Sequence, residues 1–137
     1  MEKKEQTILQ VTEAMVRQGG YNAFSFRDIA QKVGIKSSSV HYYFPTKEDL
    51  GAAVAKYYTD KFITSLGSPI ELLEQGKNPI EYYVDAIRHA VTKDKRMCLC
   101  GMLGAEANGL PQRVVAETQA FFTRCLLYTS PSPRDRG

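Results

Sequence analysis

Residues 24–50 have the sequence FSFRDIAQKVGIKSSSVHYYFPTKEDL, and this stretch decides the fold of the chain. Ser25, followed three residues later by Asp28, is typical of a helix start, because both side chains can bond free N–H groups of a first turn. Gly34 is suited to end that helix, since glycine adopts the left-handed conformation at little cost. A second, shorter helix is expected to run through three serines until Pro45 stops it. The pattern predicts two short helices joined by a tight turn.

The sequence on both sides of this pair also predicts helices. Thr46 and Asp49 have the spacing of a capping box, and the helix that they open is expected to end near residues 67–69. Upstream, apolar residues at helical spacing within residues 8–15 predict a helix that stops at Gly19 and the glycine after it.

The rest of the chain has the same helical periodicity. Asn78 and Pro79 are typical of a helix start, and the helix after them has the clearest apolar stripe of the chain. The stripe consists of Ile80, Tyr83, Val84, Ile87 and Val91. Further helices are expected over residues 100–107 and from Pro111 onward. Because no segment alternates as strands do, the sequence predicts an all-α fold.

The composition favours a soluble, cytoplasmic protein. Hydrophobic residues make up 43% of the chain, yet no apolar run approaches the roughly 18 residues of a membrane span. The charged N-terminus leads into no signal-peptide core. The odd set of Cys98, Cys100 and Cys125 favours a reducing compartment. With only two histidines and no second cysteine pair, no metal or other cofactor is expected.

The second short helix has the residue types that a DNA-reading helix needs. Its three serines are small enough to approach base edges, and their hydroxyls can bond bases or phosphates. Tyr42 and Tyr43 fall on its outer side, where they can reach the sugar-phosphate backbone. Lys47 starts the next helix, where its ammonium group and the first-turn amides together suit a phosphate. The net charge of +3 adds little, so the prediction depends on where these side chains lie.

Residues 8–66 strongly resemble the DNA-binding head of TetR-type transcriptional repressors. The family motif has glycine and a hydrophobic residue, then two small residues, a hydrophobic residue, Tyr-x-His/Tyr-Phe, and finally x-x-Lys-x-x-Leu. This chain matches it with Gly34, Ile35, Ser38, Ser39, Val40, Tyr43, Phe44, Lys47 and Leu50. The resemblance implies that the residues facing DNA are Arg27, Ser37, Ser38, Ser39, His41, Tyr42, Tyr43 and Lys47.

The chain departs from the family motif at two positions. His41 stands where the family usually has tyrosine, which would shorten that phosphate contact. Lys36 stands where a serine often caps the recognition helix. Ser37 is therefore expected to serve as the cap, which would move the helix start by one residue.

The resemblance also implies a domain organisation and partners. Residues 1–66 would form the three-helix, helix-turn-helix head. Residues 67–127 would form an incomplete helical domain for effector binding and dimerisation, in which residues 96–111 resemble the connecting region. Residues 128–137 are expected to be a disordered or non-native tail. The complete protein would be a homodimeric, ligand-responsive repressor on a palindromic double-stranded operator, and not an enzyme.

Several side chains are candidates for an effector site, although the same pattern is typical of an ordinary core. The candidates for lining the pocket are Tyr57, Phe62, Tyr83, Met97, Met102 and Phe121. Glu106 is expected to bind a cationic ligand or to pair with Arg113.

The cysteines allow a second interpretation. Cys98 and Cys100 are candidate sensor thiols, because Lys95 and Arg96 beside them would favour a thiolate; the alternative is two small packing residues. A thiol-based redox protein using this pair is thus one alternative function, although no base or oxyanion pattern accompanies the sulfurs. A shortened chain that does not dimerise and binds DNA weakly or not at all is another.

Overall fold

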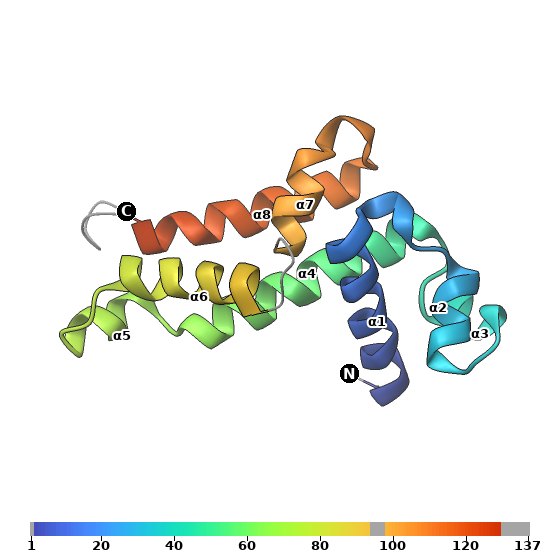
Figure 1. Cartoon of the computed structure of the whole chain (residues 1–137), viewed down its shortest axis with the longest axis horizontal. Helices are drawn as coiled ribbons and strands as arrows, with labels where there is room; N and C mark the ends of the chain where they lie inside the picture. The colour runs from blue at the N-terminus through green and yellow to red at the C-terminus, as the bar shows by residue number, and fades with distance from the viewer. Residues whose placement is uncertain (1, 94–97, 130–137) are drawn as a thin grey trace.

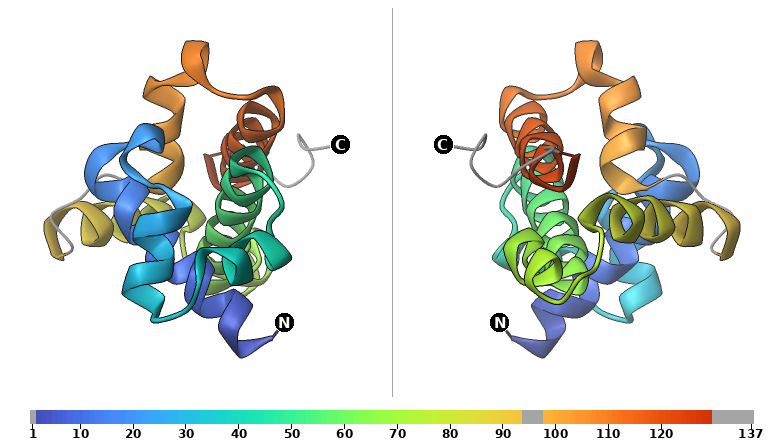
Figure 2. Two further views of the ribbon diagram at one scale, coloured as in Figure 1. Left: turned by 90° about the vertical axis from the view of Figure 1, so that its right-hand side faces the viewer. Right: turned by 90° about the vertical axis from the view of Figure 1, so that its left-hand side faces the viewer.

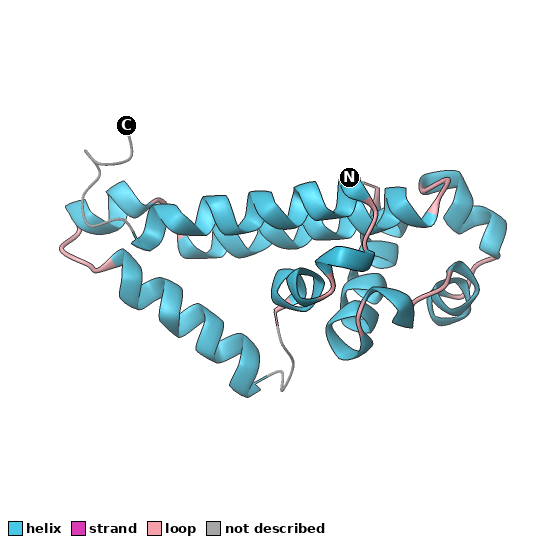
Figure 3. Ribbon diagram, turned by 90° about the horizontal axis from the view of Figure 1, so that it is seen from above, coloured by secondary structure: helices cyan, strands magenta, loops and turns pink. Residues whose placement is uncertain are grey.

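The computed structural model describes residues 2–93 and 98–129, and the regular structure of this part is entirely helical (Figure 1, Figure 3). The α-helices are α1 (Lys3–Gly19), α2 (Phe26–Val33), α3 (Ser37–Tyr43), α4 (Lys47–Leu66), α5 (Pro69–Glu74), α6 (Pro79–Lys93), α7 (Leu99–Ala105) and α8 (Gln112–Thr129), and the 3-10 turns are η1 (Tyr21–Ala23) and η2 (Ala107–Gly109). The all-α prediction is confirmed. Among these residues, no helix has both the length and the apolar character that crossing a bilayer requires.

The predicted start and end of α2 are confirmed. The Ser25 hydroxyl accepts a hydrogen bond from the Asp28 N–H at 3.1 Å, which satisfies one donor of the first turn. Gly34 ends the helix with a φ of 85°, and its N–H donates to the Ala30 carbonyl. The left-handed residue lets the chain turn sharply, so that α3 packs against α2. On α3, Val40 is fully buried, which fixes one side of that helix to the core.

The start of α3 differs from the prediction. Lys36 is the N-cap and makes no side-chain capping bond, and Ser37 is already the first helical residue. The expectation that Ser37 caps the helix is therefore wrong. The reason is the length of the turn: Lys36 has an extended backbone, with ψ at 150°, and helical geometry begins directly after it. A residue with helical dihedrals cannot serve as the cap.

Helix α4 is the central element, because α1 and α8 both pack against it (Figure 1). Its N-terminus has the predicted capping box between Thr46 and Asp49. Gly51 allows the close approach of two neighbours: a Cβ at this position would lie 2.7 Å from the Tyr21 ring and 3.0 Å from a methyl group of Val114. The N-terminal turn η1 and helix α8 therefore meet over the same turn of α4.

The remaining helices extend this core away from α2 and α3. Phe62 lies 5.4 Å from Phe121 and 6.3 Å from Tyr83, measured between ring centroids, so one aromatic cluster joins α4, α6 and α8. Figure 3 shows α6 diverging from the two long helices. Only Tyr83 and Ile87 of the predicted stripe pack against the core, whereas its other three residues are more than 40% exposed.

The end of the described chain corrects one boundary. Tyr128 was expected to start a tail, but it lies in α8, is 1% exposed, and its hydroxyl donates to the Gly67 carbonyl. The rest of the predicted tail beyond Thr129 lies outside the described residues. The short helix α5, capped by Ser68, was not predicted.

Candidate nucleic-acid interface

Helix α3 has one buried side and one side open to solvent. Val40 is fully buried and Phe44, directly after the helix, is 5% exposed. On the opposite side, Ser37 and Ser38 are exposed, and the Tyr42 side chain is 81% exposed. Figure 2 (left) shows that α2 and α3 form one end of the molecule. A helix anchored in this way can present its outer side to a groove of DNA without rearranging.

The two tyrosines of α3 are held differently. The Tyr43 hydroxyl donates to a Glu2 carboxylate oxygen at 2.9 Å, and this hydrogen bond raises the pKa of Tyr43. The rings of Tyr42 and Tyr43 contact each other edge to face, with centroids 5.1 Å apart. The chain before α1 therefore contacts the exposed side of α3 through a carboxylate, a contact that sequence reasoning missed.

Lys47 lies at the first position of α4, as predicted, but over two aromatic rings. Its ammonium nitrogen is 4.8 Å from the centroid of the Tyr21 ring and 4.7 Å from that of Phe24. Cation–π contacts of this length hold the charge in place. The ammonium group is therefore fixed beside the first-turn amides of α4.

The other two predicted DNA contacts lie on the same helix pair. The His41 ring packs on Phe26, with centroids 4.2 Å apart, and its Nδ1 donates to the Pro45 carbonyl at 3.2 Å. Arg27 is exposed on the first turn of α2. The eight predicted residues thus occupy α2, α3 and the first position of α4, and their contact with DNA stays a prediction.

The five described candidates for an effector pocket have different surroundings, and their role in binding an effector stays a prediction. Phe121 is fully buried, and it joins Phe62 and Tyr83 in the aromatic cluster. Tyr57 instead lines an open groove of about 600 Å³ between α1 and α4, where its hydroxyl accepts a bond from Gln10 at 3.4 Å. Met102 is half-buried on α7. Met97 lies outside the described residues.

The cysteines have structural contacts. The Cys98 sulfur caps α7 by accepting from the Gly101 N–H at 3.2 Å. Cys100 is fully buried, and this burial raises the pKa of its thiol to about 12. Because the thiolate is the reactive form, the geometry does not support a sensor or redox role for Cys100. Lys95 and Arg96, expected to favour a thiolate, lie outside the described residues. Elsewhere in the described chain, no three His, Cys, Asp or Glu side chains converge on a metal position.

The predicted pairing of Glu106 with Arg113 is wrong, and binding of a cationic ligand by Glu106 stays a prediction. Its carboxylate accepts a hydrogen bond from the Tyr21 N–H at 2.9 Å, while Arg113 pairs with Asp49 at the start of α4. Glu106 therefore connects the turn after α7 to the turn after α1. This contact between distant segments has no local sequence signal, because it depends on how α7 packs beside α1.

Comparison with known proteins agrees with this geometry. Residues 8–54 match the model of the family described as bacterial regulatory proteins, tetR family. A regulator from Bacillus subtilis (strain 168), described as the uncharacterized HTH-type transcriptional regulator YuxN, is 31% identical over 83 residues, which are 61% of this chain and 28% of that protein.

Two solved structures have the same arrangement of helices. A TetR transcriptional regulator from Legionella pneumophila superposes with a TM-score of 0.77 and 34% identity, over 90% of this chain and 68% of that one. A TetR-family regulator from Agrobacterium tumefaciens gives a TM-score of 0.74 and 32% identity, over 88% and 64% of the two chains. This chain thus spans between about a quarter and two thirds of the length of these relatives.

Proposed function

Because this chain belongs to the TetR family of bacterial regulatory proteins, we propose that it is a ligand-responsive repressor that binds a palindromic operator as a homodimer. The chain is a transcriptional regulator with a helix-turn-helix. The proposal of operator binding depends mainly on the arrangement of α3. The buried Val40 anchors this helix, and its serines and the exposed Tyr42 face solvent. In a dimer, two such helices would enter successive major grooves about 34–36 Å apart.

Each predicted residue has a role that its position supports. Ser37, Ser38 and Ser39 lie in the first turn of α3 and would bond base edges or nearby phosphates. Tyr43 and Lys47 would hold phosphates on either side of the groove, and Arg27, His41 and Tyr42 would extend that contact along the backbone. Phosphate contacts set the register of the helix, while the serines supply the sequence preference.

The contacts between the head and the remaining helices support a response to a ligand. We take residues 1–66 as the head and residues 67–127 as the effector part, which α4 joins because it packs against both α6 and α8. The Glu106 bond to Tyr21 adds a second connection. A small molecule that shifts α6 or α8 would thereby change the position of α3, typically with a coupling of about 1–3 kcal/mol.

The proposal is tested by selecting duplexes from a randomised DNA library and measuring their affinity across a salt series. The Lys47→Ala/Tyr43→Ala double variant is expected to lose at least about tenfold in affinity for the selected duplex. Lys56→Ala, in the groove between α1 and α4, is the matched control and should change affinity by less than about twofold. Equal binding of selected and scrambled duplexes by the original chain would overturn the proposal.

The alternative of a chain that does not dimerise rests on its exposed apolar side chains. Val84 and Val91 on α6, and Phe122 and Leu126 on α8, are all more than 40% exposed. Light scattering after size exclusion distinguishes the two cases. A dimer supports the proposal, whereas a monomer that binds the selected duplex no better than a scrambled one supports the alternative.

A further inference from the structure

The Lys47 ammonium lies in a corner formed by two aromatic rings. The rings of Tyr21 and Phe24 meet edge to face, with an interplanar angle of 90° and centroids 5.3 Å apart. The Lys47 nitrogen is 4.8 Å from the first centroid and 4.7 Å from the second, so each ring forms one wall beside it. Both rings belong to the core, because Tyr21 is 6% and Phe24 is 2% exposed. This pair of rings, the aromatic corner, therefore gives the lysine a rigid support.

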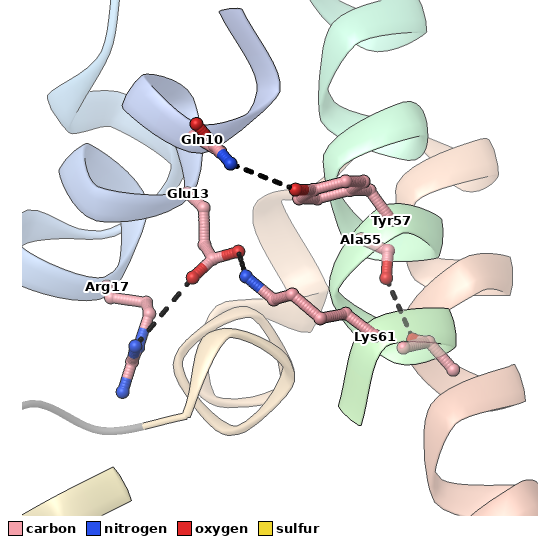
Figure 4. Close-up of polar contacts among 7 residues, drawn as sticks. Gln10, Glu13, Arg17, Ala55, Tyr57 and Lys61 are labelled. Atoms are coloured by element: carbon pink, nitrogen blue, oxygen red, sulfur yellow. Dashed lines mark hydrogen bonds and ion pairs between the residues drawn. The ribbon is translucent and has the colours of Figure 1, made fainter. Parts of the chain in front are cut away.

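A second lysine of α4 is held in a different way. The Lys61 nitrogen lies 5.1 Å from the centroid of the Tyr57 ring and also donates to a Glu13 carboxylate oxygen at 2.8 Å (Figure 4). The carboxylate offsets the charge of Lys61 within the fold. The Lys47 ammonium instead contacts two rings, which carry no net charge. The aromatic corner thus fixes the position of the Lys47 ammonium and leaves its charge for an anion outside the protein.

A short stretch of chain joins the aromatic corner to the two helices of the helix-turn-helix. Tyr21 begins the turn η1, Phe24 follows this turn with an extended backbone, and Ser25 directly after it caps α2. Helix α2 in turn packs against α3. Because these segments are consecutive and packed together, Lys47 has a fixed place relative to the exposed side of α3. A phosphate bound at Lys47 would therefore set the register in which α3 meets the bases.

The C-terminal part of the chain also contacts the aromatic corner. Glu106 accepts the Tyr21 N–H at 2.9 Å, and this bond fixes the backbone that carries the ring. The ring packs closely on α4, because a Cβ at Gly51 would lie 2.7 Å from it. A methyl group of Val114, on α8, would lie 3.0 Å from the same Cβ. The residue after α7 and a residue of α8 therefore help to determine where Tyr21 lies.

We propose that Tyr21 and Phe24 are positioning residues that hold Lys47 at a DNA phosphate, and that Glu106 sets the position of Tyr21. This inference rests on the proposed function, since the phosphate belongs to the operator. The two rings are too buried to contact DNA themselves, so they act through the lysine. A shift of the C-terminal end of α7 would reach the phosphate contact through Glu106 and Tyr21.

The positioning role is tested by the salt dependence of binding to the selected duplex. Each lost phosphate contact lowers the magnitude of the slope of log affinity against log salt by about 0.9. Lys47→Met should show this loss. Tyr21→Leu and Phe24→Leu should lower the slope toward the Lys47→Met value and weaken binding about three- to tenfold at low salt. A variant that is merely less folded would lose the same factor at every salt concentration, so an unchanged slope in Tyr21→Leu would overturn the proposal.

Matched variants separate the support of Lys47 from a general loss of packing. Tyr21→Phe keeps the ring and should bind within about twofold of the original chain, with the same slope. Tyr82→Leu, on α6, removes a ring 5.6 Å from another lysine, Lys77, and should leave the slope unchanged and the affinity within about twofold. In a Lys47→Met background, Tyr21→Leu should weaken binding by less than about twofold, because no ammonium remains to be positioned. The same loss in both backgrounds would contradict the positioning role.

The part of Glu106 is measured on the same duplex. Glu106→Ala should weaken binding about threefold or more and lower the slope, because the backbone of Tyr21 loses its acceptor. Glu106→Gln keeps an acceptor oxygen and should stay within about twofold of the original chain. The loss in Glu106→Ala should disappear in the Lys47→Met background. Equal affinities and slopes of the alanine and glutamine variants would overturn the role of Glu106.

A measurement without DNA decides the aromatic corner by itself. Protons over the face of an aromatic ring resonate upfield, so the Lys47 methylene protons nearest the ammonium should lie upfield of their position in urea. Tyr21→Leu should remove part of this shift, and Tyr82→Leu should leave it unchanged. Lys47 signals at the urea position in the folded chain would overturn the proposal. A chain that binds the selected duplex no better than a scrambled one would instead overturn the proposed function and the phosphate contact, while the upfield shift would still decide whether the two rings hold Lys47.

Discussion

The Glu106 carboxylate accepts the Tyr21 N–H at 2.9 Å, and this bond joins segments 85 residues apart in the sequence. It lies where α1 has ended and the chain turns toward α2. Gly20, directly before Tyr21, has a φ of 89°, and a Cβ there would lie 2.6 Å from a Glu106 oxygen. The Glu106 carboxylate can therefore approach closely because Gly20 has no side chain, as well as because Tyr21 donates its N–H to it.

Replacing Glu106 should test this connection. Glu106→Ala removes the acceptor of a partly buried N–H, and we expect it to lower the free energy of unfolding by about 1–2 kcal/mol in urea denaturation. Glu106→Gln keeps an acceptor oxygen of the same reach and should cost less than about 1 kcal/mol. Equal stabilities of the alanine and glutamine variants would show that the bond contributes little.

Gly20→Ala should lower the free energy of unfolding more than the same change at Gly67. Gly67 has a similar φ of 80°, but nothing lies within 4 Å of a Cβ placed there. Gly67→Ala therefore measures backbone strain alone, expected at about 1 kcal/mol, and Gly20→Ala should exceed it by about another 1 kcal/mol. In a Glu106→Ala background that excess should shrink. An unchanged excess would mean that the carboxylate is not the obstacle. Urea denaturation of all four variants gives these differences.

Acid stability should depend on the Asp49–Arg113 pair. The hydrogen bond from Arg113 is the largest cause that lowers the pKa of Asp49, and Thr46 lowers it further. A lowered carboxyl pKa stabilises the fold fully above the unfolded value of about 3.9, and this stabilisation is lost as the pH falls through the folded value. Arg113→Ala should therefore have a lower Tm than the original chain at pH 7, with the gap closing below pH 4. Arg88→Ala, which breaks an exposed pair with Asp85, is the control and should show no such pH-dependent gap.

Cys100 should react slowly with alkylating reagents. Because burial raises the pKa of its thiol to about 12, almost none of it is thiolate at pH 8. In the native chain we expect iodoacetamide to label Cys100 at least about a hundredfold more slowly than in urea, as followed by peptide mass spectrometry. Native labelling as fast as in urea would restore the sensor interpretation for this residue.

Local signals predicted the helix-turn-helix well, because caps and turns depend on neighbouring residues. The bonds at Ser25, Gly34 and Thr46 each join residues three or four apart. The start of α3 was missed by one residue. Ser37 was expected to be the N-cap with an extended backbone, but Lys36 has that conformation. Sequence periodicity gives the face of a helix but not its exact first residue.

Contacts between distant helices could not be predicted in this way. Asp49 pairs with Arg113 and Asp60 pairs with Arg124, so that both pairs are 64 residues apart and α4 runs parallel to α8. That register decides that Arg113 reaches Asp49 rather than Glu106. The cavity of about 360 Å³ between α1, α4 and α6 was missed for the same reason, because it forms only where three helices meet.

The Glu2 contact gives a last prediction, on DNA affinity. Tyr43 donates its hydroxyl hydrogen to Glu2, so a phosphate that takes this bond must displace a carboxylate of the same charge. Glu2→Ala should therefore raise affinity for the selected duplex about three- to tenfold, most clearly at low salt. Glu74→Ala, at the end of α5, removes the same charge far from α3 and should have a smaller effect. In a Tyr43→Phe background, which lacks the hydroxyl, the gain from Glu2→Ala should fall toward that of Glu74→Ala. An equal gain in both backgrounds would assign the effect to charge alone and remove the hydrogen bond from the account.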